Sequence, residues 1–150
     1  EAYSRLGEYG YDTVLNMFCL HGHNGPITVH GEGAQVRPLV HIDDISKFYV
    51  HLVSQPHLSG GSFNYGLENI SLIALACKIS QKVIKKDSDD KRSYRISSRK
   101  AIEVFGIQPD ISLESGIFEI QTTLINGGYV DPDKNSIYYN VKRMKEIGLT

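Results

Sequence analysis

The chain has 150 residues, of which 41% are apolar and 22% are charged, proportions that are ordinary for a globular protein with one modest core. Its formal net charge of -1 creates no field that would attract nucleic acid or an anionic membrane surface, so neither partner is expected. Cys19 and Cys77 lie far apart and no membrane-length apolar run occurs, so we expect a cytoplasmic protein with reduced thiols.

The spacing of apolar residues predicts alternating helices and strands, which is typical of a mixed α/β fold. Gly22 and Gly25 are expected to end the first helix, and Asp43 or Asp44 to cap the second. Residues 87–91 lack an apolar period and are expected to form a polar loop. In chain order, the expected elements are a helix at 12–21, strands at 27–30 and 38–42, a helix at 44–54, a strand at 62–65, a helix at 71–84, a strand at 94–96, and helices at 98–104, 112–125 and 139–147.

A glycine-flanked turn followed by an arginine is the most informative local pattern. Gly31 and Gly33 bracket Glu32, and Arg37 follows just before the next predicted strand. Glycine lets the backbone approach a ligand closely, and a guanidinium offers a planar, permanently charged fork that suits a pyrophosphate. The pattern indicates a phosphate clamp, with an ordinary hairpin and a solvated charge as the alternative.

Further motifs occur in a fixed order along the chain. After ITVHGEGAQVRPLVHIDD at 27–44 come GGSFNYG at 60–66, SLIALACKI at 71–79, DKRSYRIS at 90–97, KAIEVFGIQP at 100–109 and SLESGI at 112–117. The ordered set resembles the NAD-dependent epimerase/dehydratase family, the extended short-chain dehydrogenases that modify sugar nucleotides. The resemblance implies the C-terminal, substrate-binding portion of that fold for residues 12–150. Residues 1–11 match the family poorly and are expected to be an atypical segment that follows a truncation or rearrangement.

We expect two features of the complete family to be missing. One is the Gly-rich turn that holds the cofactor pyrophosphate on a helix N-terminus. The turn at residues 31–33 lacks the third glycine and precedes a strand. The other is the catalytic Tyr-x-x-x-Lys pair, which Tyr3, Tyr9 and Tyr11 do not form, since none of them has a lysine four positions later. We therefore expect no N-terminal Rossmann half, no cofactor bound by this chain alone, and no redox catalysis by it alone. NAD(P) is implied only for the full-length family.

The resemblance assigns binding roles to four residues. Arg37 matches an arginine that grips the nucleotide diphosphate, and Arg92 matches a later arginine that reaches the same phosphates from the other side. Asn16 matches an asparagine near the diphosphate, with the capping of a nearby turn as the alternative. His30 stands where the family often has a tyrosine near the nucleotide base, with an exposed histidine at a strand end as the alternative.

Other polar residues are interpreted as structural. Asn64 would brace a turn through backbone hydrogen bonds, and His41 would be a satisfied group at a buried strand end. Asp43 and Asp44 are adjacent at a helix start, which does not give the geometry of a general acid/base pair. The His-Gly-His sequence near the end of the first helix has no third ligand at a familiar spacing, so no metal site is expected.

Two functions follow from these patterns. The first is the binding of an NDP-hexose by the substrate portion of an epimerase- or dehydratase-like protein, either as a fragment of a longer enzyme or as a split subunit whose partner supplies the Rossmann half. The second is a non-catalytic module that self-associates or binds a partner through the apolar surface that a Rossmann half would cover. The base, the sugar and the reaction type are not encoded in these motifs.

Overall fold

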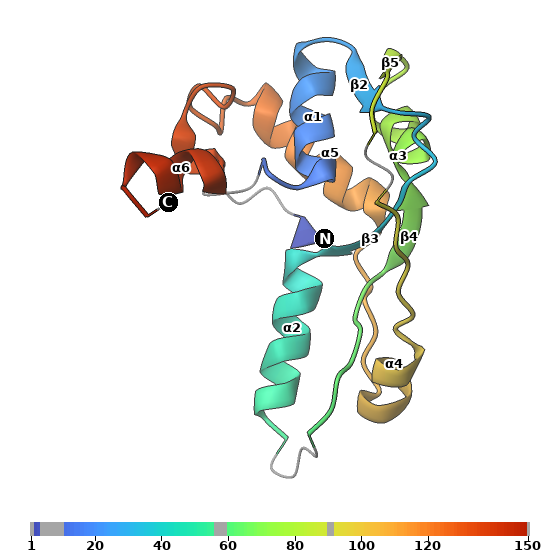
Figure 1. Ribbon diagram of the computed structural model, residues 1–150. Coiled ribbons are helices and arrows are strands. Elements are labelled where there is room, and N and C mark those ends of the chain that lie inside the picture. Colours follow the sequence, from blue (N-terminus) through green and yellow to red (C-terminus); the bar gives the residue numbers. More distant parts are fainter. Residues whose placement is uncertain (1, 4–10, 56–59, 90–91, 150) are drawn as a thin grey trace.

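The computed structural model describes residues 2–3, 11–55, 60–89 and 92–149. Within these residues helices and short strands form a mixed α/β arrangement, as the sequence predicts (Figure 1). In chain order the elements are β1 (Ala2–Tyr3), α1 (Val14–Asn24), β2 (Ile27–His30), β3 (Val36–His41), α2 (Ile42–Val53), β4 (Glu68–Ser71), α3 (Leu72–Ile79), β5 (Val83–Lys86), α4 (Arg99–Phe105), α5 (Leu113–Ile125), the 3₁₀ helix η1 (Ser136–Tyr138) and α6 (Asn140–Glu146).

Strand β3 lies at the centre of the larger sheet. It pairs in parallel with β1 on one side and antiparallel with β4 on the other, and all of its residues are buried. Strands β2 and β5 form a separate parallel pair. Because a parallel pair needs a long crossover connection, the β2–β5 pairing brings together two segments that are distant in the sequence.

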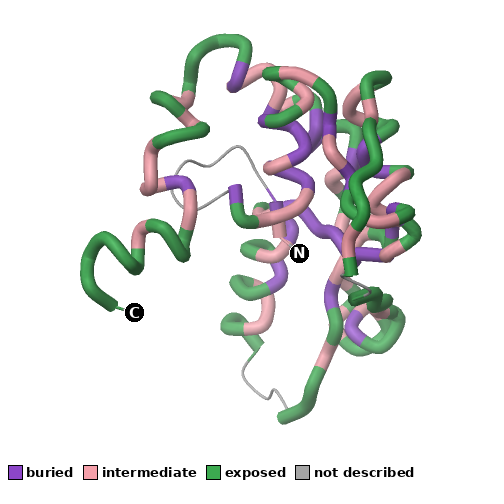
Figure 2. The backbone as a smooth tube through the Cα atoms, turned by 45° about the horizontal axis from the view of Figure 1, so that its top comes forward, coloured by how far each residue is buried: buried purple, intermediate pink, exposed green. Residues whose placement is uncertain are grey.

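Two hydrophobic clusters stabilise the fold. The larger one joins α1, α3 and α5 with β2 and β3, and Leu15, Leu39 and Ile120 are completely buried in it. The smaller one lies beside α2, where the rings of Phe48 and Tyr65 stack at 4.0 Å. Figure 1 shows α2 extending away from the α1–α5 layer, and Figure 2 shows that most of the C-terminal segment is exposed.

Local signals predicted several helix ends correctly. The Ser112 hydroxyl accepts the N–H of Ser115 at the start of α5, and Ser71 accepts the N–H of Ala74 at the start of α3. Gly106 follows α4 in the left-handed conformation with φ of 67°, which glycine adopts without strain. These helix ends depend on neighbouring residues only, so the sequence pattern is sufficient to predict them.

Helix α1 passes through Gly22, which was expected to end it, and continues to Asn24. A Cβ atom at position 22 would lie 3.2 Å from Ile27 and 3.3 Å from Ile79. Gly22 therefore permits α1 to pack closely against Ile27 and Ile79, and Gly25 ends the helix.

The strand predicted at 62–65 is wrong, since β4 lies further along the chain. Tyr65 is buried and Asn64 is exposed, which is the alternation that suggested a strand. Among the described residues, the side-chain hydrogen bonds that brace this region come from Ser98 and Lys100 and not from Asn64. The Ser98 hydroxyl accepts the N–H of Gly66 and donates to its carbonyl, at 2.8 Å each.

The strand predicted at 94–96 is also wrong. The Tyr94 N–H donates to the Val36 carbonyl at 3.3 Å, but the backbone groups of Ile96 bond to the side chain of Asn69. A side chain replaces the partner strand here, so no ladder forms.

The helix predicted at 71–84 ends early, at Ile79. Ser80 has extended backbone angles (φ -147°, ψ 147°), and β5 follows. Val83 and Ile84 are β-branched and pair in register with Ile27 and Thr28 of β2. Because a short apolar run fits both a helix and a buried strand, the sequence pattern did not separate the two elements.

The N-terminal segment assigned to 1–11 is described only in part, since residues 4–10 lie outside the described residues. Tyr3 and Tyr11 are both buried in the larger cluster. The Tyr3 ring lies against Gly116 of α5, where an added Cβ would overlap it. This end of the chain therefore takes part in the core.

Candidate functional site

Arg37 has a guanidinium group that the backbone holds in a fixed position. The residue is only 8% exposed. Its Nη1 donates to the carbonyl of Val36 at 3.0 Å and to that of Arg92 at 2.6 Å, and its Cζ lies 5.1 Å from the centre of the Tyr94 ring. Since the side chain is already ordered, less conformational entropy is lost when it binds an anion.

A cavity of about 220 Å³ lies beside Arg37. Its wall is half apolar, and its polar groups come from separate parts of the chain that the fold brings together. A cavity of this kind, with an apolar body and a few convergent polar groups, is typical of a small-molecule site. The residues that line it are Asp12, Val14, Met17, Phe18, His30, Arg37, Leu72 and Ser88.

A second cavity of about 500 Å³ adjoins the first, since Ser88 lines both. Its wall includes the turn between β2 and β3, where Gly31 and Gly33 have positive φ values of 68° and 72°. A Cβ on Gly33 would lie 2.8 Å from side-chain atoms of Ile73 and Val29. The turn therefore requires glycine at position 33, because of its packing against Ile73 and Val29; the predicted close approach of a ligand stays a prediction. The lining residues are Gly31, Glu32, Ala34, Gln35, Asp87, Ser88, Asp89 and Ser93.

Glu32 at the rim of the larger cavity is paired with a lysine. Its Oε2 lies 2.7 Å from Nζ of Lys85, and this hydrogen bond lowers the pKa of the Glu32 carboxyl. Both side chains are largely exposed, so the pair contributes little to stability. It does join the β2–β3 turn to β5.

The four residues predicted to bind substrate are placed differently from one another. Arg37 and His30 line the same cavity. The carbonyl of Arg92 accepts a hydrogen bond from Arg37, and the Arg92 side chain is exposed. Asn16 is buried in α1 and is not among the described residues that line either cavity.

The sequence reasoning missed three features of the site. Ser88 belongs to the segment that was predicted to be a polar loop, and Tyr94 to a segment predicted to be a strand. Asp12 was placed at the start of a helix. No local signal marks these residues, because β5 and the segment after it must first be positioned against β2 and β3.

The turn at residues 31–33 does not fit a dinucleotide cofactor. It connects β2 to β3, so its N–H groups do not open a helix as a pyrophosphate-binding turn would. No group of three or more His, Cys, Asp or Glu side chains that could hold a metal ion occurs among the described residues. Within residues 2–3, 11–55, 60–89 and 92–149, no helix is both long enough and apolar enough to cross a membrane.

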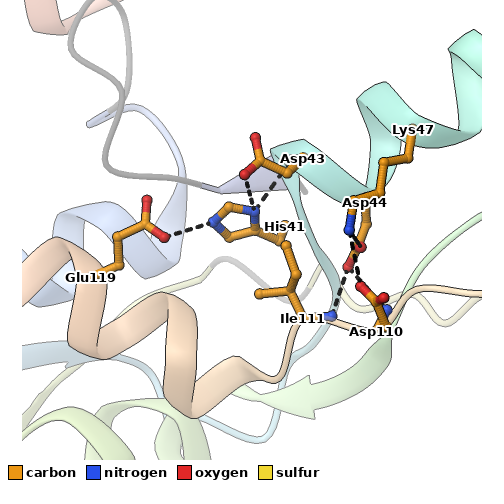
Figure 3. Close-up of polar contacts among 7 residues, drawn as sticks. All are labelled: His41, Asp43, Asp44, Lys47, Asp110, Ile111 and Glu119. Carbon is orange, nitrogen blue, oxygen red and sulfur yellow. Dashed lines mark hydrogen bonds and ion pairs between the residues drawn. The ribbon is translucent and has the colours of Figure 1, made fainter.

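His41 caps α2, which corrects the prediction that Asp43 or Asp44 would do so. The buried His41 ring accepts the N–H of Asp43 through Nδ1 at 3.2 Å, and its Nε2 lies 3.3 Å from Oε2 of Glu119 (Figure 3). Nε2 faces this carboxylate without forming a hydrogen bond to it. His41 therefore links β3 to α2 through Nδ1, whereas the prediction that its ring would be satisfied is not met at Nε2, which has no hydrogen-bond partner among the described residues.

Asp44 is a buried carboxylate that holds the segment before α5. Its Oδ2 accepts the N–H groups of Asp110 and Ile111, and Lys47 lies 3.6 Å from its Oδ1 (Figure 3). Asp44 therefore has a structural role in joining two segments, in place of the predicted capping role.

Solved structures share this fold. The chain superimposes on UDP-N-acetylglucosamine 4-epimerase from Bacillus cereus with a TM-score of 0.68 and 21% identity, covering 85% of this chain and 44% of that one. For UDP-glucose 4-epimerase with UDP-glucose from Thermotoga maritima, the TM-score is 0.71 and the identity 21%, with 85% and 44% covered. For dTDP-glucose 4,6-dehydratase from Bacillus anthracis in complex with NAD, the TM-score is 0.67 and the identity 15%, with 95% and 45% covered.

The chain thus has part of the mixed α/β fold of these sugar-nucleotide epimerases and dehydratases, as its motifs predicted. It spans less than half the length of the structures it matches. No protein-family model and no curated protein matches the sequence. At these identities the similarity shows the fold alone.

Proposed function

We propose that this chain binds the diphosphate of a nucleotide sugar at Arg37, as the substrate-binding portion of an epimerase- or dehydratase-like protein. The observation that carries the proposal is the buried guanidinium of Arg37, held by two backbone carbonyls on the wall of a cavity that His30 and Ser88 also line. A fixed guanidinium can form paired, charge-assisted bonds to phosphate oxygens.

The two adjoining cavities supply room for the rest of such a ligand. His30 ends β2 and lines the smaller cavity, while the next residue, Gly31, lines the larger one. A diphosphate at Arg37 would therefore extend past His30 toward the β2–β3 turn. Arg92 contacts Arg37 through its carbonyl and has an exposed side chain, and we assign this side chain to the outer phosphate oxygens. Asn16 remains a candidate contact from α1.

Redox chemistry lies outside this proposal for the chain alone. The turn at 31–33 is not a dinucleotide turn, and none of Tyr3, Tyr9 and Tyr11 forms a Tyr-x-x-x-Lys pair. Tyr138 and Lys142 have this spacing, but Tyr138 is buried, its hydroxyl accepts the N–H of Val130 at 3.1 Å, and neither residue lines the cavity beside Arg37. The dTDP-glucose 4,6-dehydratase structure from Bacillus anthracis is a complex with NAD. We therefore propose that any oxidation of the sugar requires a further polypeptide region that binds the cofactor.

Calorimetric titration with UDP-, GDP-, CDP- and dTDP-sugars tests the proposal, with Arg37→Lys and Arg37→Ala as variants. Arg99→Ala is the matched control, because Arg99 is largely exposed on α4 and lines a different cavity. We expect saturable binding to at least one ligand. Arg37→Ala should weaken it at least about tenfold, as expected for loss of charge-assisted bonds.

Arg37→Lys keeps the charge but loses the fork, so it should weaken binding to a smaller extent. Thermal unfolding of each variant shows that the fold is retained. The proposal is wrong if no nucleotide sugar binds, or if Arg99→Ala weakens binding as much as Arg37→Ala does.

One observation favours the second function, self-association. Helix α2 exposes a large apolar surface, with Tyr49 at 62%, Val50 at 71% and Val53 at 88% exposure. Exposed apolar patches of this kind often mark protein contacts. A second copy of the chain burying α2 would give a dimer that Val53→Asp weakens. Sedimentation velocity across a wide concentration range tests this, and a monodisperse monomer at high concentration would contradict it.

A further inference from the structure

Residues 92–98, here called the strap, lie across β3 and β4 and are fastened mainly by side chains. The hydroxyl of Ser93 accepts the N–H of Val36 at 3.0 Å, and the N–H of Tyr94 donates to the Val36 carbonyl at 3.3 Å. The far end is held by the Ser98 hydroxyl. The position of the strap therefore depends on the identity of a few side chains, unlike that of a strand in a backbone ladder.

Asn69 of β4 fastens the middle of the strap. Its Oδ1 accepts the N–H of Ile96 at 2.9 Å, and its Nδ2 donates to the Ile96 carbonyl at 2.9 Å. One amide side chain thus supplies both bonds that a neighbouring strand would have exchanged with Ile96. Removing the amide would release both backbone groups together.

The strap also supports Arg37. The carbonyl of Arg92 accepts the N–H of Arg37 Nη1, and the Tyr94 ring lies 5.1 Å from the guanidinium. The orientation of the Arg37 fork, and the place from which the Arg92 side chain starts, are therefore set by how the strap sits on β3 and β4.

We propose that Asn69 is a positioning residue for the nucleotide diphosphate: it fixes the strap, and the strap fixes Arg37 and Arg92. This inference rests on the proposed function. Asn69 is paired with Pro38, whereas Arg37 is paired with Ile70. Successive residues of a strand point to opposite faces. Asn69 therefore lies on the face opposite Arg37, where it lines a separate cavity of about 390 Å³, and it acts through the strap without touching the ligand.

The test compares Asn69→Ala with Gln108→Ala. Gln108 is also an exposed amide on the wall of that separate cavity, and in the described part of the chain it is not bonded to the strap. We expect Asn69→Ala to weaken UDP binding about tenfold, the factor for one misplaced charge-assisted bond, and Gln108→Ala to change it less than about twofold.

A double-mutant cycle separates positioning from general destabilisation. In a background that carries both Arg37→Ala and Arg92→Ala, Asn69→Ala should have almost no further effect on UDP affinity, because both of its routes to the ligand are gone. A merely structural role would give the same loss in both backgrounds, and would overturn the proposal. So would equal affinities of Asn69→Ala and the unmodified protein.

A second readout needs no ligand and keeps the two proposals distinguishable. The ¹H–¹⁵N signal of the Arg37 guanidinium, identified by its loss in Arg37→Ala, should shift in Asn69→Ala and stay in place in Gln108→Ala. If no nucleoside diphosphate binds the unmodified protein, the proposed function fails, and the position of this signal still decides whether Asn69 positions Arg37. An unmoved signal in Asn69→Ala refutes the positioning role.

Discussion

Asp44→Ala should destabilise the fold strongly, although Asp44 is remote from the Arg37 cavity. The carboxylate is 1% exposed, and its Oδ2 accepts the N–H of Asp110 at 3.3 Å and that of Ile111 at 3.1 Å. The substitution leaves two backbone donors without their acceptor, and each unsatisfied buried donor costs about 1–3 kcal/mol. Alanine regains at most about 0.7 kcal/mol through helix propensity. We expect a loss of about 2–5 kcal/mol in the free energy of unfolding.

Lys47→Ala is the matched control for this prediction. Lys47 forms ion pairs with Asp44 and Asp110, but its side chain is 54% exposed, so its removal should cost less than about 1 kcal/mol. Urea denaturation followed by circular dichroism measures both variants, and a lower midpoint at constant slope reports lost stability. An Asp44→Ala variant within about 0.5 kcal/mol of the unmodified protein would refute the reasoning.

Three further predictions concern other parts of the fold. Burial raises the pKa of the Cys19 thiol to about 12, so a thiol reagent should label only the exposed Cys77 in the native protein and both cysteines in denaturant; two fast-reacting native thiols would contradict this. Gly116→Ala should lower the melting temperature, because the new Cβ would overlap the Tyr3 ring. The overlap costs about 1–3 kcal/mol or more, whereas alanine gains about 1 kcal/mol in helix propensity. A raised melting temperature would show that the ring moves freely. A hydrogen bond from Lys78 of α3 lowers the pKa of the Glu114 carboxyl below its ordinary value of 4.5. The stabilising effect of this carboxylate should therefore be present above pH 4.5 and disappear as the pH falls through the lowered pKa. Glu114→Gln should flatten the acid side of a profile of stability against pH.

The helices were predictable where their signals are local. Ser112 and Gly106 determine a helix start and a helix end through bonds and angles of neighbouring residues. Strand β2 was predicted with its observed bounds, because its alternating burial matches the pleat. For these elements, tertiary contacts agree with local preference.

Non-local pairing explains the errors. The segment Val83–Lys86 becomes a strand only because β2 lies beside it, and a continuing apolar run gave no sign of that partner. The strap was predicted to contain a strand, yet its hydrogen bonds are made largely by side chains: Asn69 bonds to Ile96, and the hydroxyls of Ser93 and Ser98 bond to the backbone of Val36 and Gly66. Sequence periodicity reports burial and does not identify hydrogen-bond partners.

The same limit applies to the candidate site. The glycine turn and Arg37 were recognised from spacing and chemistry, and the structure places them on adjoining cavities. Ser88 and Tyr94 were not recognised, since their places follow from β5 and from the strap. A site built from loops can be predicted from its sequence only as far as the packing of those loops can be.

The most direct test of the proposed phosphate site compares the affinities of UDP and uridine for the unmodified protein and for Arg37→Ala. We predict that the unmodified protein binds UDP at least about tenfold more tightly than uridine, because the diphosphate adds charge-assisted bonds. The Arg37→Ala variant should lose this difference and retain the weak affinity for uridine. Equal affinities for UDP and uridine in the unmodified protein, or a difference that survives in Arg37→Ala, would contradict a diphosphate site at Arg37.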